Sequence, residues 1–438
     1  MKIRHALLCW LVLTPAWLSA QETKTAANGE QYLLICLGYC QGPECSREAM
    51  AQIAALRPAQ QKRGLRLGVS AIFSYFQFPR ETLAGHIARF LRAAEELDLP
   101  VVVQFEGEHW RDARPDLWNW WDPKLPGFDP ENRRNVEWDG WGPEHAIRVS
   151  WINWGRQVRI RPAQNLMASR YRDAVHAEMR ASIPLVLDWW RRLPAEKKDL
   201  FVGVKVGHET SIGVNGFYYP NGNALADRPE KDDPRRPLIV EQLPARGMAP
   251  IGYAAVSTLG LAKSGPLKEE HLAEAVRVYL RDLCRWAHEL GVPRQRLFTH
   301  CGGWANGEKL YAAAVNEFSC PGWSFYAHGM NPRGDATTMA ALDKSDAPYW
   351  GAVEWLPLGA ASQQDWEESF RNTLAVARCR YLCVFHWKII KDLPYATKAV
   401  TAVLTAAGDD NDHAPSKTQG KTQGKAPGKP RAGSPPAK

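Results

Sequence analysis

Short apolar runs alternate with longer amphipathic stretches along most of the chain. Eight runs rich in Val, Ile, Phe and Tyr are nearly continuously apolar, as buried parallel strands are. They lie at residues 32–37, 65–73, 101–105, 201–206, 297–299, 323–326, 349–353 and 381–385. The spacing of apolar residues between them predicts helices at 46–56, 82–97, 171–192, 269–290, 307–317 and 364–377.

This alternation predicts an α/β fold, a single (β/α)₈ TIM barrel. Eight strand and helix repeats favour closure, and about 385 residues without a Pro/Gly/Ser-rich linker suit one barrel with long loops. An open doubly wound sheet is the alternative. The first strands are not followed by G-x-G-x-x-G or G-x-x-x-x-G-K-[ST], which argues against that alternative.

Two long loops leave the third and fourth predicted strands, at 107–169 and 210–266. Both start at the C-terminal end of a strand, where barrel enzymes build their sites. Indole rings beside amide and carboxylate groups suit sugars, whose C–H faces are apolar and whose hydroxyls are not. The pair Trp120 and Trp121 is predicted to bind substrate, although such rings also form a loop core. The first loop carries eight tryptophans, Trp110, Trp118, Trp120, Trp121, Trp138, Trp141, Trp151 and Trp154.

The two ends of the chain differ in composition from the part between them. Residues 1–20 have a basic start, an apolar run and small residues at the end, which predicts a secretory signal cleaved after Ala20; a retained anchor is the alternative. Residues 408–438 lack large apolar side chains and are predicted to be disordered, which leaves 21–407 as the barrel domain. We therefore expect an exported protein, periplasmic or extracellular, without an integral membrane span.

The basic character of the chain comes from its ends. The formal net charge is +8, of which residues 1–20 carry +2 and residues 416–438 carry +6, so the domain between them is neutral. The charge therefore gives no indication of a nucleic-acid partner. The oligomeric state is left open.

Nine cysteines are present, and Cys9 lies in the predicted signal. The remaining eight permit disulfides in an oxidising compartment without fixing their pairing. A metal site is the competing reading for Cys36, Cys40 and Cys45. They form no C-x-x-C and have no nearby histidine to complete a four-ligand set, so neither a metal nor another cofactor is expected.

Two of the predicted strands end in a glutamate beside the long loops. The fourth ends in His208-Glu209-Thr210 and the seventh in Val353-Glu354. Cleavage of a glycosidic bond uses two carboxyl groups, one protonated as the acid and the other ionised. A rim ion pair with an arginine is the alternative for either glutamate alone. The joint position of the two predicts a catalytic pair.

In these features the chain resembles the retaining glycoside hydrolases of clan A, whose barrels carry the acid/base after strand four and the nucleophile after strand seven. The resemblance implies that Glu209 is the acid/base and Glu354 the nucleophile. It also implies that Tyr326, after strand six, and Trp387, after strand eight, bind substrate. The clan has asparagine before the acid/base, where this chain has His208, so a divergent member is expected. A histidine there can still donate to a sugar hydroxyl, and His208 is assigned to substrate binding. The tryptophan-rich loop is similar to that of β-galactosidase-like members.

Other polar and aromatic residues at strand ends complete the expected site. Glu106 and Glu108 share a face of the third strand and are assigned to substrate binding or to holding the tryptophan loop. His300 and His328 follow strands five and six and are candidates for binding sugar hydroxyls, with a structural role as the alternative. Trp355, next to Glu354, is predicted to contact substrate.

The sequence therefore predicts a secreted retaining glycoside hydrolase that cleaves an extracellular glycan by double displacement, without a cofactor. One alternative is a carbohydrate-binding barrel without catalysis. Another is an inverting glycosidase that pairs Glu209 with a loop acid such as Asp139. The carboxyl separation distinguishes the two mechanisms, at about 5–5.5 Å for retention and about 6.5–9.5 Å for inversion. Sugar, linkage and exo or endo action depend on loop geometry and are left open.

Overall fold

The computed structural model describes residues 30–40, 45–61, 63–108, 110, 113–153, 157–212, 216–218, 249–302 and 307–405. The predicted signal and the predicted tail lie outside these residues. Within them, no helix combines the length and the apolarity needed to cross a bilayer.

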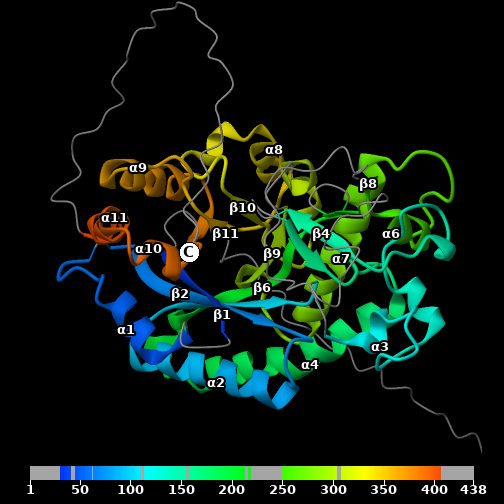
Figure 1. The fold of residues 1–438 in the computed structure, drawn as a ribbon. Coiled ribbons are helices and arrows are strands. Elements are labelled where there is room, and N and C mark those ends of the chain that lie inside the picture. The colour runs from blue at the N-terminus through cyan, green and yellow to red at the C-terminus, as the bar shows by residue number, and fades with distance from the viewer. Residues whose placement is uncertain are drawn as a thin grey trace, which may run out of the picture.

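Eight parallel strands form a closed barrel, so the predicted fold is confirmed (Figure 1). All eight apolar runs are strands, because each is buried on both faces. Around the barrel they follow one another as β1 (Gln31–Tyr39), β2 (Leu65–Ser74), β3 (Val101–Glu106), β6 (Phe201–Thr210), β9 (Leu297–Cys301), β10 (Gly322–Phe325), β11 (Trp350–Trp355) and β12 (Cys379–Val384), and β12 pairs with β1.

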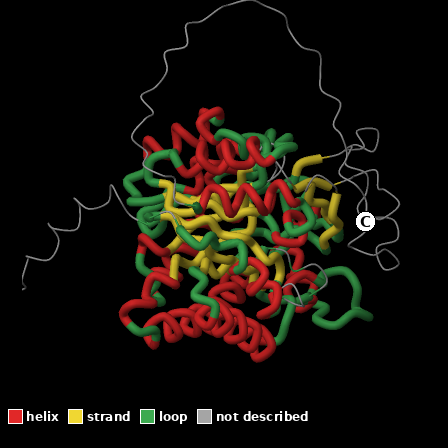
Figure 2. The backbone as a smooth tube through the Cα atoms, turned by 90° about the vertical axis from the view of Figure 1, so that its left-hand side faces the viewer, coloured by secondary structure: helices red, strands yellow, loops and turns green. Residues whose placement is uncertain are grey.

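Helices cover the outside of the barrel (Figures 1 and 2). Five of the six predicted helices are α-helical, and the run predicted at 307–317 is a 3₁₀ helix, η9 (Gly307–Ala314). Three further helices, α8, α10 and α11, were not predicted. The α-helices of this layer are α1 (Arg47–Ala54), α2 (Arg80–Glu96), α4 (Ser169–Arg192), α7 (Glu269–Glu289), α8 (Ala336–Lys344), α9 (Gln363–Leu374), α10 (Trp387–Ile390) and α11 (Pro394–Leu404).

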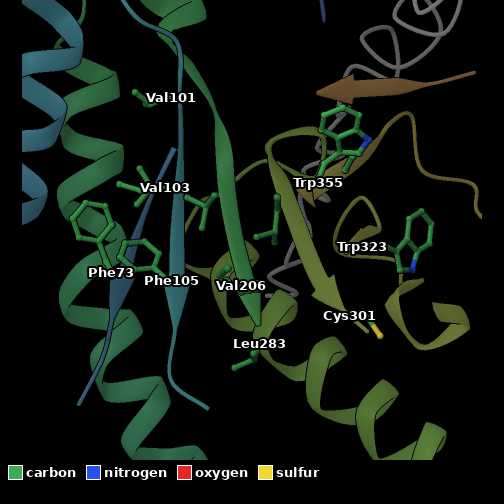
Figure 3. Close-up of a cluster of buried hydrophobic side chains, with 14 of the residues drawn as sticks. Phe73, Val101, Val103, Phe105, Val206, Leu283, Cys301, Trp323 and Trp355 are labelled. Atoms are coloured by element: carbon green, nitrogen blue, oxygen red, sulfur yellow. The ribbon is translucent and has the colours of Figure 1, made fainter. Parts of the chain in front are cut away.

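The hydrophobic core lies mainly between the barrel wall and the helices. Phe73 of β2 and Phe105 of β3 contact each other there, and Val206 of β6 and Leu283 of α7 belong to the same cluster (Figure 3). Burying each such side chain contributes about 1.5–3 kcal/mol. A second, smaller cluster fills the interior of the barrel. Together they hold the strand ends that carry the site.

The two long loops pair with each other in a small antiparallel sheet that the sequence did not predict. Strands β4 (Ser150–Asn153) and β5 (Gln157–Ile160) come from the first loop, and β7 (Gly216–Tyr218) and β8 (Ala249–Pro250) come from the second. Ile147, Ile152, Ile160 and Ile251 form an aliphatic cluster against this sheet. The loops therefore form one structural unit.

A buried carboxylate also ties the two loops together. Glu137 of the first loop accepts hydrogen bonds from the backbone N–H groups of Ala254 (3.1 Å) and Ala255 (3.2 Å). These groups lie in the first turn of α6 (Tyr253–Thr258), where the helix dipole favours a negative charge. Burial nevertheless raises the pKa of Glu137 to about 7.

All eight cysteines outside the predicted signal are described, and all are free thiols. Seven are buried and Cys45 is partly buried. Within the described residues the fold is therefore held by packing and hydrogen bonds without a covalent cross-link.

Candidate active site

The end of strand β6 bulges before it reaches its last residue. The pairing of β6 with β9 shifts register between Val206 and Thr210. Within this bulge Gly207 has φ +91° and Glu209 has φ +46°, both in the left-handed region. A Cβ on Gly207 would lie 2.9 Å from the carbonyl oxygen of His300, so a larger residue does not fit. A left-handed non-glycine residue costs about 1–3 kcal/mol, which the surroundings must offset.

Glu108 holds this bulge in place. Its Oε1 accepts hydrogen bonds from the backbone N–H of His208 (3.0 Å) and from the hydroxyl of Thr210 (2.6 Å). These two residues flank Glu209, so Glu108 fixes the backbone on both sides of the candidate acid. Burial raises the pKa of the Glu108 carboxyl to about 8. The sequence assigned Glu108 to substrate binding or to holding the tryptophan loop. The structure adds a third role, which is to hold the end of β6.

Glu209 and Glu354 each accept a hydrogen bond from a hydroxyl group of β10 or the residue after it. Ser324 Oγ donates to Glu209 Oε1 at 2.8 Å, and the hydroxyl of Tyr326 donates to Glu354 Oε2 at 2.7 Å. Both glutamates are buried, at 6% and 4% exposure. The two partner residues show that the ends of β6, β10 and β11 meet at one place.

The two candidate catalytic carboxyls interact electrostatically. Burial, and then the charge of Glu209, raise the pKa of Glu354 well above its usual value. Two interacting carboxyls release their protons in separate steps that belong to the pair. Between these steps the pair holds one proton. A double displacement starts from this state with the charge on the attacking carboxyl. At Glu354 burial and the charge of Glu209 oppose that charge, and Lys205 and the hydrogen bond from Tyr326 favour it.

A buried lysine lies beneath this pair. The Nζ atom of Lys205, on β6, lies 2.5 Å from Glu106 Oε1, 2.9 Å from His300 Nδ1 and 3.0 Å from the carbonyl oxygen of Gly207. His208 Nε2 lies 3.2 Å from the other oxygen of Glu106. The structure therefore brings Glu106, His208 and His300 together, with Glu106 and His300 on Lys205 and His208 on Glu106. Substrate binding by Glu106 and His208 stays a prediction.

His300 bonds through both ring nitrogens inside the protein. Its Nε2 lies 2.8 Å from Ser324 Oγ, and its Nδ1 faces Lys205. The side chain is fully buried. Both ring nitrogens are thus bonded within the protein, and we no longer expect His300 to bind sugar hydroxyls.

Glu106, His300 and Glu354 offer atoms within 4.8 Å of one another, the arrangement that a metal ion requires. Lys205, however, already bonds to two of the three. Its ammonium charge would repel a cation placed among them. The cluster thus fits a hydrogen-bond network better than a metal site.

Two predicted tryptophans lie on the helix side of the barrel wall. Trp355 is fully buried, stacks on Phe370 of α9 with ring centroids 5.0 Å apart and donates to Thr373 Oγ1. Neighbouring residues of a strand face opposite sides, so Glu354 points inward and Trp355 outward. Trp387 begins α10 and belongs to the same outer core. We no longer expect either tryptophan to contact substrate.

Phe385 lies between strand β12 and Trp387. In contrast to Trp355 and Trp387, it packs against the cluster inside the barrel. His328 is exposed in the turn after β10, and Asp139 pairs with His145 in the first long loop at 3.3 Å. None of these three residues has a described contact with Glu209 or Glu354.

The tryptophan loop extends the main hydrophobic core, which includes Trp110 and Trp118. Its indole N–H groups donate to backbone carbonyls, as Trp110 does to Pro162 (2.7 Å) and Trp138 to Arg133 (2.8 Å). Four of its rings, Trp110, Trp118, Trp138 and Trp151, are buried.

The other described tryptophans of the loop are more exposed than these four. Trp120, Trp121 and Trp141 are half-buried. Trp121 stacks on Trp118 at 5.3 Å and Trp120 donates to the carbonyl of Ile147. Substrate binding by Trp120 and Trp121 stays a prediction, and Trp154 lies outside the described residues.

Two cavities lie near the upper part of the barrel. One, of about 30 Å³, is lined by Glu108, His208 and Glu209 on one side and by aliphatic side chains of the small sheet on the other. The other, of about 450 Å³, lies between the end of β1 and helices α1 and α2, and is lined by Arg47, Arg89 and other residues. Of these two cavities, the smaller one borders Glu209, a candidate catalytic residue, and has room for about one water molecule.

Sequence reasoning missed two residues of this network, Lys205 and Ser324. Both stand inside apolar runs, Phe201-Val-Gly-Val-Lys205-Val and Trp323-Ser324-Phe. A charged or hydroxyl residue within a strand that is buried on both faces needs a polar partner. That requirement was a usable signal of a polar barrel interior.

No protein-family model and no curated protein matches the sequence. Among solved structures, the chain is similar to a GH5-4 broad specificity endoglucanase from an uncultured bacterium, with 9% identity over 86% of this chain and 95% of the other and a TM-score of 0.42.

It is also similar to a glycoside hydrolase family 5 enzyme from Prevotella bryantii B14, with 10% identity, 87% and 98% coverage and a TM-score of 0.41. A mannanase from Bacillus subtilis gives 10% identity, 89% and 91% coverage and a TM-score of 0.41. The chemistry of this chain rests on the residues described above.

Proposed function

We propose that the chain is a retaining glycoside hydrolase that cleaves a glycan by double displacement. The observation that carries this proposal is the buried, electrostatically interacting pair of Glu209 and Glu354 at the ends of the fourth and seventh strands of a closed barrel. Two carboxyls that share one proton match the requirement of glycosidic bond cleavage.

In the first step Glu354 attacks the anomeric carbon. Tyr326, which donates to Glu354 Oε2, holds that carboxylate in one orientation and leaves Oε1 as the attacking atom. Glu209 gives its proton to the glycosidic oxygen as the bond to the leaving group breaks. The product of this step is a glycosyl ester on Glu354 and a free alcohol.

In the second step Glu209, now ionised, takes a proton from water. The hydroxide that forms attacks the anomeric carbon from the side that the leaving group occupied, and the ester bond to Glu354 breaks. Both glutamates return to their starting states, and the sugar keeps its anomeric configuration. Glu209 gives one proton to the leaving group and regains one from water, so the protons balance without another group, and we propose that no cofactor takes part.

A substrate screen with a product-anomer assay tests this proposal. Aryl glycosides and polysaccharides are offered, and ¹H NMR identifies the anomer released first. The expected product has the configuration of the substrate. Release of the opposite anomer supports the inverting alternative, whereas saturable binding without turnover supports a carbohydrate-binding barrel.

We also propose that the protein is exported, which rests on the composition of residues 1–20. Mass spectrometry of protein from the periplasm or medium of the expressing cells should find Gln21 as the first residue. A product that retains Met1 and stays with the cells would contradict this proposal.

A further inference from the structure

Lys205 has a hydrogen-bond acceptor for each of its three protons. The acceptors are Glu106 Oε1, the carbonyl oxygen of Gly207 and His300 Nδ1. A lysine ammonium has three donors and no acceptor. The side chain is fully buried, and its charge is balanced by the equally buried Glu106. In this arrangement Lys205 donates to His300.

This contact fixes where His300 carries its proton. Because Nδ1 accepts from Lys205, a neutral ring has its proton on Nε2. Burial first, and then the charge of Lys205, hold the pKa of His300 well below its usual value, so the ring stays neutral. Its Nε2 lies 2.8 Å from Ser324 Oγ, and His300 therefore donates to Ser324.

The direction of the next bond follows from the last. A serine hydroxyl has one proton and an oxygen that accepts. Since the oxygen of Ser324 accepts from His300, its proton points to Glu209 Oε1, 2.8 Å away. The four side chains form one directed chain of hydrogen bonds, from Lys205 through His300 and Ser324 to Glu209.

We propose that Lys205 is a positioning residue for Glu209. Acting through His300 and Ser324, it keeps a donor on Oε1 of Glu209, so that the proton given to the leaving group is carried on Oε2. This inference rests on the proposed function for its catalytic meaning. The directed chain itself rests on the three contacts alone.

The charge of Lys205 also acts on the site directly. It lowers the pKa of Glu354, so removing Lys205 has two effects. Ser324 is uncharged, and removing its hydroxyl changes only the hydrogen bonds. Besides Lys205, the titratable groups around Glu209 and its neighbours in the described part of the chain include Glu106, Glu108, His208, His300, Tyr326 and Glu354, with Tyr39 behind His208 and the buried thiols of Cys36 and Cys383.

The pH dependence of kcat/KM separates positioning from a merely structural role. A donor on a carboxylate favours its ionised form. In Ser324→Ala the alkaline limb, which reports the acid, should move to higher pH by about one unit, while the acidic limb stays. Ser324→Thr keeps a hydroxyl and should restore the wild-type limb. Lys205→Met should move both limbs to higher pH.

Controls address folding and surface charge. Lys205→Met removes the ammonium that balances the buried charge of Glu106. The double variant Lys205→Met/Glu106→Gln removes both charges and is measured beside it as the variant expected to keep the fold. Lys309→Met removes an exposed lysine that pairs with Glu269 and should leave the profile unchanged. An alkaline limb that stays in place in Ser324→Ala, with only kcat reduced, overturns the positioning role.

Nitrogen NMR of the His300 ring tests the directed chain without substrate. The wild type should show a protonated Nε2 and a bare Nδ1 from about pH 5 to 8. In the double variant of Lys205 and Glu106 the proton should move to Nδ1. A wild-type ring that titrates near pH 6.5, or that carries its proton on Nδ1, overturns the inference.

The two experiments can contradict the proposed function and the chain of hydrogen bonds independently of each other. The expected ring state together with an absence of turnover on every glycoside counts against the proposed function and leaves the chain of hydrogen bonds intact. The carboxyl ¹³C signal of Glu209 then decides the last link. Its titration should move to higher pH in Ser324→Ala, and a signal that does not move contradicts the link.

Discussion

The ends of the barrel strands and the tryptophan loop are the two regions of the sequence richest in candidate site residues, and their side chains are buried in different ways. The strand ends bring charged and hydroxyl side chains into the barrel interior, where they bond to one another. The tryptophan loop directs several indole N–H groups to its own backbone. The first region forms a candidate site and the second mainly forms a core.

The difference lies in what burial demands of each side chain. An indole that bonds one carbonyl has satisfied its single polar atom, and the rest of the ring stabilises by packing. A buried carboxylate or ammonium needs partners for every oxygen or proton, and such groups are costly unless a network holds them. A cluster of buried charges is therefore better evidence of function than a cluster of aromatic rings.

The largest expected effect lies in the barrel. Glu354→Gln removes the nucleophile, so activity should fall by roughly 10⁴ for every leaving group. Glu270→Gln, at an exposed position, is the matched control and should be fully active. Steady-state kinetics on an aryl glycoside measures both. Full activity of Glu354→Gln would move the chemistry elsewhere, with Glu106 and Glu108 next in line.

The next effect separates the two glutamates. Glu209→Gln removes proton donation, so substrates with good leaving groups should still form the glycosyl ester and then stall. Added azide should restore turnover by replacing the water that Glu209 activates. The same addition should leave Glu354→Gln inactive. Equal losses that azide does not change would remove the distinct roles.

In the loop, the expected effect is on stability. Trp110 is fully buried and its N–H bonds to Pro162, so Trp110→Ala should lower the free energy of unfolding by about 3–5 kcal/mol. KM of the folded protein should stay near the wild-type value. Urea denaturation and kinetics on one preparation measure both quantities. A raised KM with unchanged stability would make Trp110 part of the site.

Two buried carboxyls, one in each region, allow a comparison by pH. The native pKa is about 8 for Glu108 and about 7 for Glu137, both raised by burial from 4.5. Their stabilising contribution is full below pH 4.5 and is lost as pH rises through these values. Between pH 7 and 8 the larger loss comes from Glu108, which is still mostly protonated there and should lower stability by on the order of 1 kcal/mol, whereas the loss from Glu137 is nearly complete and smaller there.

Glu108→Gln should therefore flatten the stability profile up to pH 8, and Glu137→Gln only up to about pH 7. Denaturation at pH 5, 7 and 8 measures both variants beside the wild type. Identical profiles for the two variants would mean that the two regions bury their carboxyls to the same degree.

The last expected effect concerns the half-buried ring of Trp121. Trp121→Ala should lower stability by about 1–2 kcal/mol, less than Trp110→Ala, and should raise KM a few-fold if the ring contacts sugar as the sequence predicts. Arg148, which lies over the neighbouring Trp120, offers a control at the loop surface. An unchanged KM in Trp121→Ala would make the whole loop a core.

The barrel was predictable because its strands are apolar on both faces and so leave a continuous signal in the sequence. The small sheet was not, because its strands have two to four residues and pair across the two loops. Glu209 and Glu354 could be proposed from the sequence because they end such runs. Lys205 and Ser324, which belong to the same buried network, were missed because they stand inside such runs.

The position of Trp355 illustrates a different limit. Alternation along a strand already places it opposite Glu354, since adjacent residues face opposite sides. The prediction that Trp355 contacts substrate rested on its position next to Glu354 in the sequence and did not take this alternation into account. The exposure of each loop tryptophan, in contrast, depends on contacts between distant segments, and periodicity holds no information on those.

Closure of the barrel by β1 and β12 has a consequence for the order of folding. The first strand must wait for the last as the chain is synthesised, since Tyr32 pairs with Tyr381. Until then β1 and the growing end of the sheet present open edges, which are prone to pair with other chains. Contacts of such long sequence separation also slow folding. The site is thus completed late, and a chain that stops before β12 has both glutamates but no closed barrel to hold them.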